Sequence, residues 1–209
     1  MGRVSFDESG GATDESDVVK RALSAPLGTE HLAVNHYRIP SGAGLPGGLH
    51  AHVDQEEIFV VLSGVAVFET YVPAAGAVAT GTARTSGMAA EGGELVVEAG
   101  ETVRFAPGEF QSGRNGGDDE LEVLALGAPR DTEDVRLPVA CPECGHSDLR
   151  LETGGELTFV CPDCGAERGP RPCPDCGHEN LQVTLDDAGA VVTACRDCES
   201  TFETPPLEE

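Results

Sequence analysis

Residues 44–64 read GLPGGLHAHVDQEEIFVVLSG, and this stretch decides the fold. His50 and His52 are two positions apart, so in a β-strand both side chains point to the same face and can share one ion. A corner through residues 53–56 then leads into an apolar run that opens with Glu57. Two imidazoles and one carboxylate suit a divalent transition metal. The stretch therefore predicts a metal site where two strands meet.

The same stretch resembles the first sequence motif of the cupin family, in the spacing Gly44-x5-His50-x-His52-x4-Glu57-x6-Gly64. A partial second motif follows as Gly100-x5-Ala106-Pro107-Gly108-x2-Gln111-x3-Asn115, with Ala106 at the usual proline position. The resemblance covers roughly residues 30–128. It implies a jelly-roll β-barrel with a metal inside its mouth.

The resemblance also implies the ligand set, which is His50, His52, Glu57 and a fourth residue at position 111. The family has a histidine there, whereas this chain has Gln111, whose neutral amide oxygen is a weaker ligand than imidazole. The expected metal is Mn, Fe, Ni or Zn. The alternative is a metal-free barrel that only binds a ligand. Glu56 has the wrong spacing for a ligand and is expected to face solvent.

Short runs of Val, Ile, Phe and Thr separated by Gly and Pro surround these motifs, which is typical of an all-β domain. The expected strands are Leu32–Ile39, Ile58–Leu62, Val65–Tyr71, Glu94–Glu98, Thr102–Phe105 and Leu121–Leu126. Between them, Pro73–Gly93 is expected to be a long loop, either a functional lid or a mobile segment.

All eight cysteines follow residue 138, as four C-x2-C pairs in two similar units whose first cysteines are 32 residues apart. This is an internal duplication. The gaps of 16 and 18 residues between the pairs of each unit fit a known zinc-binding pattern. Four thiolates satisfy a tetrahedral zinc ion, so the units resemble zinc ribbons with one structural zinc each. The expected ligands are Cys141, Cys144, Cys161 and Cys164 in the first ribbon, and Cys173, Cys176, Cys195 and Cys198 in the second.

Four disulfides are the alternative, and they are disfavoured in a cytosolic chain. His146 and His178 are interpreted as turn residues, because each site already has four thiolates. His31 and His36 are interpreted as surface or pocket residues of the first strand rather than ligands. The arginines that flank the second motif, Arg104 and Arg114, favour a surface role over substrate contact.

The chain thus divides into an acidic N-terminal segment (1–29), the barrel (30–129), a charged linker (130–139) and two ribbons (140–167 and 172–204). The N-terminal segment is expected to be a partly ordered tail. The run Ile58–Leu62 is apolar on both faces, so its outward face needs a cover. The N-terminal segment, the ribbons or a second subunit can provide it, and we favour a homodimer.

The net charge is −24, from 37 acidic and 13 basic residues, and Lys20 is the only lysine. This composition resembles proteins of salt-loving archaea, because concentrated salt screens the self-repulsion of a highly charged chain. Nucleic acid is a disfavoured partner, since Arg168 and Arg171 are the only basic cluster and residues 139–209 carry a net charge of −11.

The sequence has no apolar run of about 18 residues, so a membrane-spanning helix is not expected. The acidic N-terminus does not resemble a secretory signal, and we expect a cytoplasmic protein.

Two functions remain open. One is a metal-dependent enzyme, or binding protein, for a small oxygen-rich metabolite, with ribbons for protein interaction. The other is a non-enzymatic sensor or adaptor whose ribbons contact the transcription or translation machinery.

Overall fold

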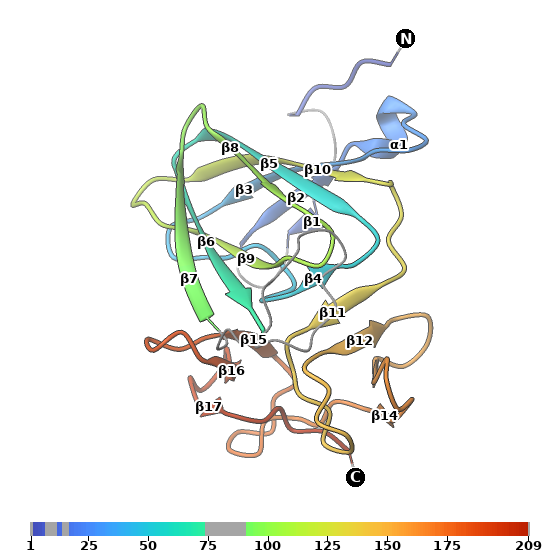
Figure 1. The fold of residues 1–209 in the computed structure, drawn as a ribbon. Coiled ribbons are helices and arrows are strands. Elements are labelled where there is room, and N and C mark those ends of the chain that lie inside the picture. The colour runs from blue at the N-terminus through green and yellow to red at the C-terminus, as the bar shows by residue number, and fades with distance from the viewer. Residues whose placement is uncertain (1, 7–11, 14–16, 74–90, 209) are drawn as a thin grey trace.

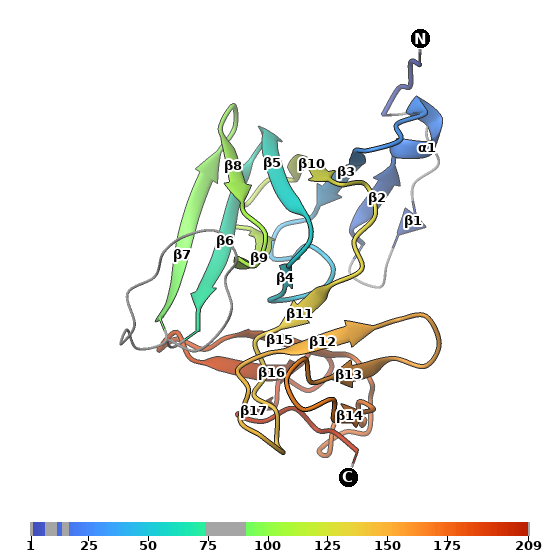
Figure 2. The ribbon, with the colours of Figure 1, turned by 45° about the vertical axis from the view of Figure 1, so that its right-hand side comes forward.

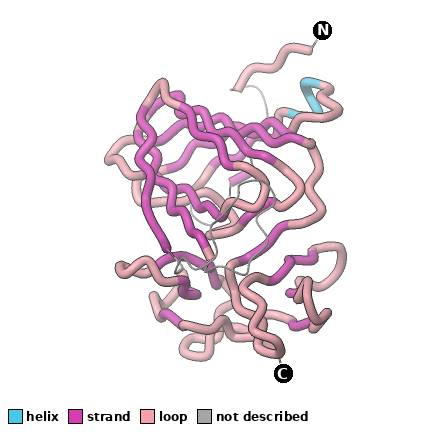
Figure 3. The backbone as a smooth tube through the Cα atoms, in the orientation of Figure 1, coloured by secondary structure: helices cyan, strands magenta, loops and turns pink. Residues whose placement is uncertain are grey.

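The computed structural model describes residues 2–6, 12–13, 17–73 and 91–208. Within these ranges the regular structure is almost entirely strand, and its one helix is the single turn α1 (Ser24–Leu27) (Figure 3). The all-β prediction is therefore confirmed. Among these residues, no helix is both long and apolar enough to cross a membrane.

Two antiparallel sheets form the barrel in the upper half of Figure 1. One sheet has the order β1-β2-β3-β10-β5-β8 and the other the order β7-β6-β9. The first contains β1 (Ala12–Thr13), β2 (Val19–Ala22), β3 (Ala33–Ile39), β5 (Glu56–Ser63), β8 (Thr102–Phe105) and β10 (Leu121–Ala128). The second contains β6 (Val65–Val72), β7 (Glu91–Glu98) and β9 (Phe110–Asn115).

The barrel core lies between these sheets. Alternate residues of β10 point inward, as the burial of Val123 and Ala125 shows. The rings of Phe59, Phe68 and Phe105 meet at centroid distances of 5.0 to 6.0 Å in tilted or edge-on arrangements. These are the geometries that aromatic pairs prefer. The aromatic cluster fills the interior next to the pocket that contains His50 and His52.

The first ribbon is continuous with the barrel, because its sheet has the order β14-β13-β12-β11-β4 (Figure 2). The strands are β4 (Ala51–His52), β11 (Val135–Leu137), β12 (Leu149–Glu152), β13 (Thr158–Val160) and β14 (Glu167–Arg168). The second ribbon is a separate sheet of β15 (Leu181–Leu185), β16 (Val191–Cys195) and β17 (Thr201–Phe202).

Both ribbons pack against the same end of the barrel. Leu49 and Phe110 from the barrel share one buried cluster with Leu137 of the first ribbon and Val183 of the second. The Thr184 hydroxyl also donates a 2.9 Å hydrogen bond to the Glu69 carboxylate. The ribbons therefore form part of the structure around the barrel mouth.

The structure differs from the sequence-based description in several places. Strand β2 belongs to the barrel sheet, whereas we expected its residues to lie in a partly ordered tail. Strand β11 lies inside the expected linker 130–139, because its backbone bridges β4 and β12. Strand β9 was not expected. The expected loop Pro73–Gly93 lies mostly outside the described residues, and β7 begins at Glu91.

The outward face of β5 is only partly covered within the described structure. Ile58 and Val60 are half-buried, whereas Leu62 is 41% exposed. The homodimer that we expected for this face stays a prediction.

Candidate metal centre

Three strands bring the candidate ligands together. His50 directly precedes β4, which contains His52, and Glu57 is the second residue of β5. Gln111 in β9 lies opposite His50 through two backbone hydrogen bonds of 2.8 and 3.1 Å. The chain turns between β4 and β5, which brings the Glu57 carboxylate next to the two imidazoles. The four residues predicted from the two motifs therefore meet in one pocket.

Hydrogen bonds fix the ring orientation of both histidines. The His50 Nδ1 atom lies 2.7 Å from the Gly48 carbonyl oxygen, which can only accept, so this nitrogen carries the proton. The His52 Nδ1 atom lies 3.2 Å from the Thr132 hydroxyl, which itself donates to the Asp54 carboxylate at 2.6 Å. Both rings consequently present an unprotonated Nε2 atom to the pocket. A histidine that binds a metal is usually oriented by such a partner on its other nitrogen.

The three donor atoms converge closely. The two Nε2 atoms are 3.2 Å apart, and His52 Nε2 is 3.5 Å from Glu57 Oε2. All three donor atoms lie within 4.8 Å of one another. Lone pairs so close repel each other unless a cation lies between them. A metal with ligand bonds of 2.0 to 2.2 Å at right angles would place neighbouring donors about 3 Å apart, so the residues fit a divalent ion.

Burial favours the neutral form of all three candidate ligands. Burial lowers the pKa of His50, and it lowers that of His52 to about 4, so both rings are neutral at pH 7. Burial also raises the pKa of Glu57 to about 7, against the opposing hydrogen bond from Gln111. A cation in the pocket would favour the ionised carboxylate.

Gln111 contacts Glu57 directly. It is 3% exposed, and its Nε2 atom donates a 3.0 Å hydrogen bond to Glu57 Oε2. In this orientation an amide nitrogen, which has no lone pair available for a metal, faces the carboxylate. Gln111 thus orients the Glu57 carboxylate, and its role as a fourth ligand stays a prediction.

The other histidines and flanking residues lie elsewhere. His36 is fully buried, with its Nε2 atom 2.7 Å from a Glu122 oxygen and its ring stacked on Phe6 at 4.3 Å. His31 is exposed. Of the two arginines that flank the second motif, Arg104 pairs with Glu56 at 2.7 Å and Arg114 pairs with Glu94 at 2.8 Å, both at the surface.

The eight cysteines form two clusters with the pairing expected from the sequence. Their Sγ atoms are separated by 3.5 to 3.7 Å across each cluster, and all the thiols are free. Four thiolates at 2.3 Å from a tetrahedral zinc would be about 3.8 Å apart, so the clusters fit zinc rather than disulfides. His146 and His178 are outside both clusters and lie near Asp148 and Asp197, at 3.5 and 3.2 Å.

Three of the four turns formed by the cysteine pairs have a glycine after the second cysteine, and the fourth has a glutamate. Gly145, Gly165 and Gly177 follow the second cysteine of their pairs with φ between 73° and 79°. Glu199 has the equivalent position in the fourth turn, with φ of 63°. Glycine adopts this left-handed conformation without steric cost, whereas glutamate does not.

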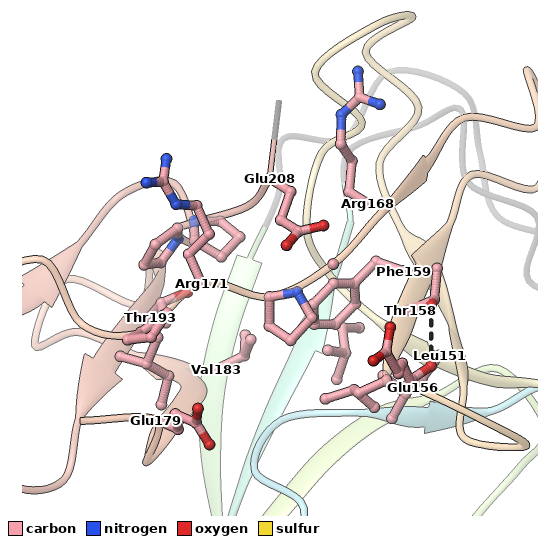
Figure 4. Close-up of a pocket in the computed structure, with 18 of the residues that line it drawn as sticks. Leu151, Glu156, Thr158, Phe159, Arg168, Arg171, Glu179, Val183, Thr193 and Glu208 are labelled. Carbon is pink, nitrogen blue, oxygen red and sulfur yellow. Dashed lines mark hydrogen bonds between the residues drawn. The ribbon is translucent and has the colours of Figure 1, made fainter. Parts of the chain in front are cut away.

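Two hollows lie near these sites. The pocket at the histidines has a volume of about 310 Å³, and its lining includes Lys20, Tyr37 and Arg130. Sequence reasoning did not associate these three residues with the metal site. A larger cleft of about 930 Å³ lies between the ribbons, where Phe159 and Val183 are among its apolar residues (Figure 4). Glutamates line that cleft, but within the described chain no three of them bring their oxygens close enough together to hold one ion.

Comparison with known proteins supports the fold. No protein-family model matches the sequence, and no curated protein is significantly similar to it. Among solved structures, the chain is similar to a putative sugar phosphate isomerase from Acidithiobacillus ferrooxidans. The two are 20% identical, with a TM-score of 0.51, over 74% of this chain and 86% of that chain.

Two other similar structures have lower scores. One is a cupin-superfamily sugar phosphate isomerase from Silicibacter pomeroyi, 16% identical over 79% of this chain and 90% of that chain, with a TM-score of 0.46. The other is an oxalate oxidase in complex with glycolate, 17% identical over 64% of this chain and 61% of that chain, with a TM-score of 0.47. The fold is a cupin barrel followed by two small four-cysteine units, as the sequence predicted. At 20% identity, the similarity to the Acidithiobacillus ferrooxidans structure supports the fold alone.

Proposed function

We propose that this protein binds a divalent transition metal in its cupin barrel and uses it to bind a small oxygen-rich molecule. One observation carries the proposal. The Nε2 atoms of His50 and His52 both face Glu57 without a proton, at distances that suit ligands of one ion. The metal would be Mn, Fe, Ni or Zn.

The bound metal would act as a Lewis acid that polarises an oxygen of the ligand. The residues of the chain prepare the site for this role. The Gly48 carbonyl and the Thr132 hydroxyl hold the two rings, and Gln111 orients the carboxylate. A pocket of about 310 Å³ admits only a small molecule. A sugar phosphate is one candidate, since a putative sugar phosphate isomerase has the same fold.

Metal analysis of the full chain tests this proposal. Two ions per chain are expected in the ribbons and a third in the barrel after loading with Mn, Fe(II), Ni or Zn. The variant His50→Ala should hold only the two ribbon ions. The matched control His31→Ala, at an exposed position, should hold three. If the wild-type protein holds only two ions under every loading condition, the metal function is wrong.

A sensor or adaptor is the second candidate, and the cleft between the ribbons favours it. Its apolar residues lie beside charged side chains of both signs, including Arg171 and Glu208 (Figure 4). Such a surface suits a protein partner. Oxygen uptake by the metal-loaded protein with diols and thiols separates the candidates. Turnover supports the enzyme, whereas binding without turnover supports the sensor.

We also propose a cytoplasmic protein adapted to high salt. The net charge of −24 and the single lysine support the salt adaptation. The two clusters of free thiols support a reducing compartment, because zinc thiolate sites need reduced cysteines.

A further inference from the structure

Lys20 and Arg130 give the metal pocket a charge opposite to that of the whole chain. Acidic residues outnumber basic ones nearly three to one in the sequence. Among the described residues that line the pocket, Glu57 is the one carboxylate, whereas Lys20 and Arg130 are both basic. The only lysine of the chain thus lies beside the candidate metal ligands.

The partners of these two cations differ from those of the arginines that form ion pairs with carboxylates. Six arginines form ion pairs with carboxylates, namely Arg38, Arg104, Arg114, Arg136, Arg150 and Arg168. Lys20 and Arg130 form no ion pair with any residue in the described part of the chain. The charge of Lys20 acts on Glu57 inside the pocket, where it lowers the pKa of that carboxyl, so it also acts on the space that a ligand would occupy.

The fold directs both residues to the pocket. Lys20 in β2 is the register partner of Tyr37 in β3, so both side chains point to the same face of the sheet. The Lys20 Nζ atom lies 5.7 Å from the centroid of the Tyr37 ring, which lines the pocket. Arg130 donates a 2.7 Å hydrogen bond to the Thr29 carbonyl, which holds its guanidinium at the same pocket.

We propose that the pocket binds a small anion, with one oxygen on the metal and its negative charge next to Lys20 and Arg130. This inference rests on the proposed metal function and names its ligand class, a carboxylate or a phosphate. The charges agree with it. A divalent metal and two cations outweigh the single charge of Glu57, and charge interactions are stronger in a partly buried pocket than in water. A neutral ligand would leave this excess positive charge unmatched.

A matched pair of ligands tests the inference by calorimetry at one salt concentration. Glycolate and glycolamide have similar size and the same hydroxyl group, but only glycolate is an anion. We expect glycolate to bind Mn-loaded protein about tenfold more tightly than glycolamide. Lys20→Met should remove most of this difference. Its Mn affinity is measured first, and both ligands are then titrated at saturating Mn, because the charge of Lys20 also acts on Glu57. Lys20→Arg should restore the difference. Arg104→Met, outside the pocket, is the control and should retain it.

Inorganic phosphate serves as the second anion, and whether it or glycolate binds more tightly identifies the preferred group. Equal binding of glycolate and glycolamide, or an unchanged difference in Lys20→Met, would overturn the inference. The stripped protein separates this result from failure of the metal site. Anion binding that depends on Lys20 and is equally tight without metal would show that the anion does not use the metal, whereas failure of the metal site itself is read from the ion content of the loaded protein. Absence of anion binding in both forms would refute the pocket itself.

Discussion

The backbone amide of Leu49 donates a 2.8 Å hydrogen bond to the carbonyl of Val183, which joins the segment before His50 to the second ribbon. The first ribbon reaches the next part of the same segment, where Val135 of β11 pairs with His52 of β4. Both candidate imidazole ligands therefore lie on backbone that the ribbons support. Zinc in the ribbons should consequently affect the metal affinity of the barrel.

The variant Cys198→Ser tests this coupling. Loss of one thiolate should release zinc and unfold the second ribbon, because units of this size depend on their metal. We expect the barrel to bind Mn about threefold to thirtyfold more weakly, the range of energetic coupling between linked sites. Isothermal titration measures the affinity, and Glu203→Gln, an exposed change in the same ribbon, is the control. An unchanged Mn affinity in zinc-depleted Cys198→Ser would show that the ribbons do not support the site.

Metal binding should release nearly one proton at pH 6 and almost none at pH 8, and Glu57 is its source. Its pKa is raised to about 7, so a metal that binds at pH 6 displaces a proton from a largely neutral carboxyl. The pKa of His52 is about 4 and that of His50 is also lowered, so neither ring contributes in this range. Affinity should rise with pH through 7 and level off above 8.

Calorimetry in two buffers of different ionisation enthalpy counts these protons. The variant Glu57→Gln should bind more weakly and release none. Release of two or three protons at pH 6 would instead mean that the histidines are protonated in the stripped protein, against the lowered pKa values.

A single glycine substitution should stabilise the second ribbon. Glu199 has the left-handed conformation that glycine has in the other three cysteine turns, and a residue with a Cβ atom pays about 1 kcal/mol for it. Glu199→Gly should therefore strengthen zinc retention, measured by competition with a chelator. Glu199→Gln removes the charge but keeps the side chain, and it should show no such gain. Equal gains in both variants would assign the effect to charge instead.

The main strands of the barrel were predictable because their apolar residues follow the sheet period. Strand β8 has the expected bounds, and β5 extends the expected Ile58–Leu62 at both ends. Strand β9 gave no such signal, since its sequence FQSGRN is polar. Its Gln111 and Asn115 are nonetheless buried, because side-chain hydrogen bonds to Glu57 and to backbone carbonyls satisfy them. Periodicity cannot detect a strand whose buried residues are polar.

The candidate site also combines residues that a local pattern predicts with residues that only the tertiary structure brings in. The spacing of His50, His52 and Glu57 was sufficient to predict their convergence, because it depends on a short local segment. Lys20 joins the pocket through pairing of β2 with β3, and no local pattern reports that contact. The one available signal was that Lys20 is the only lysine in the chain. Arg130 lies in a segment expected to be a linker, so its position also required the tertiary structure.

Stability should increase with salt concentration. Dilution from 1 M to 0.1 M salt lengthens the screening distance from about 3 to about 10 Å, which restores repulsion within a chain of net charge −24. We expect the melting temperature of the zinc-loaded protein to fall on dilution. Sodium chloride and potassium chloride should act alike if screening is the cause. A melting temperature that stays constant or rises on dilution would contradict the proposed salt adaptation.

The fourth metal position should respond to Gln111→His. Two backbone hydrogen bonds to His50 fix the backbone at position 111. A histidine at this position would therefore lie on β9, directly opposite His50. Imidazole is a better ligand than an amide for Zn, Ni and Cu, and the two side chains have similar volumes. We expect Gln111→His to bind Ni and Zn about tenfold more tightly than the wild-type protein, with the fold unchanged.

A second substitution at the same position separates ligation from orientation of the carboxylate. Gln111→Leu removes the 3.0 Å hydrogen bond to Glu57 but supplies no ligand, so it should bind metal more weakly than the wild type. The hydrogen bond lowers the pKa of Glu57, and its loss should move the pH at which metal binds upward. Arg114→Ala, at an exposed position of the same strand outside the pocket, is the control for general effects on β9. If Gln111→His binds no more tightly than the wild type, position 111 is not adjacent to the metal, and Gln111 acts only on Glu57.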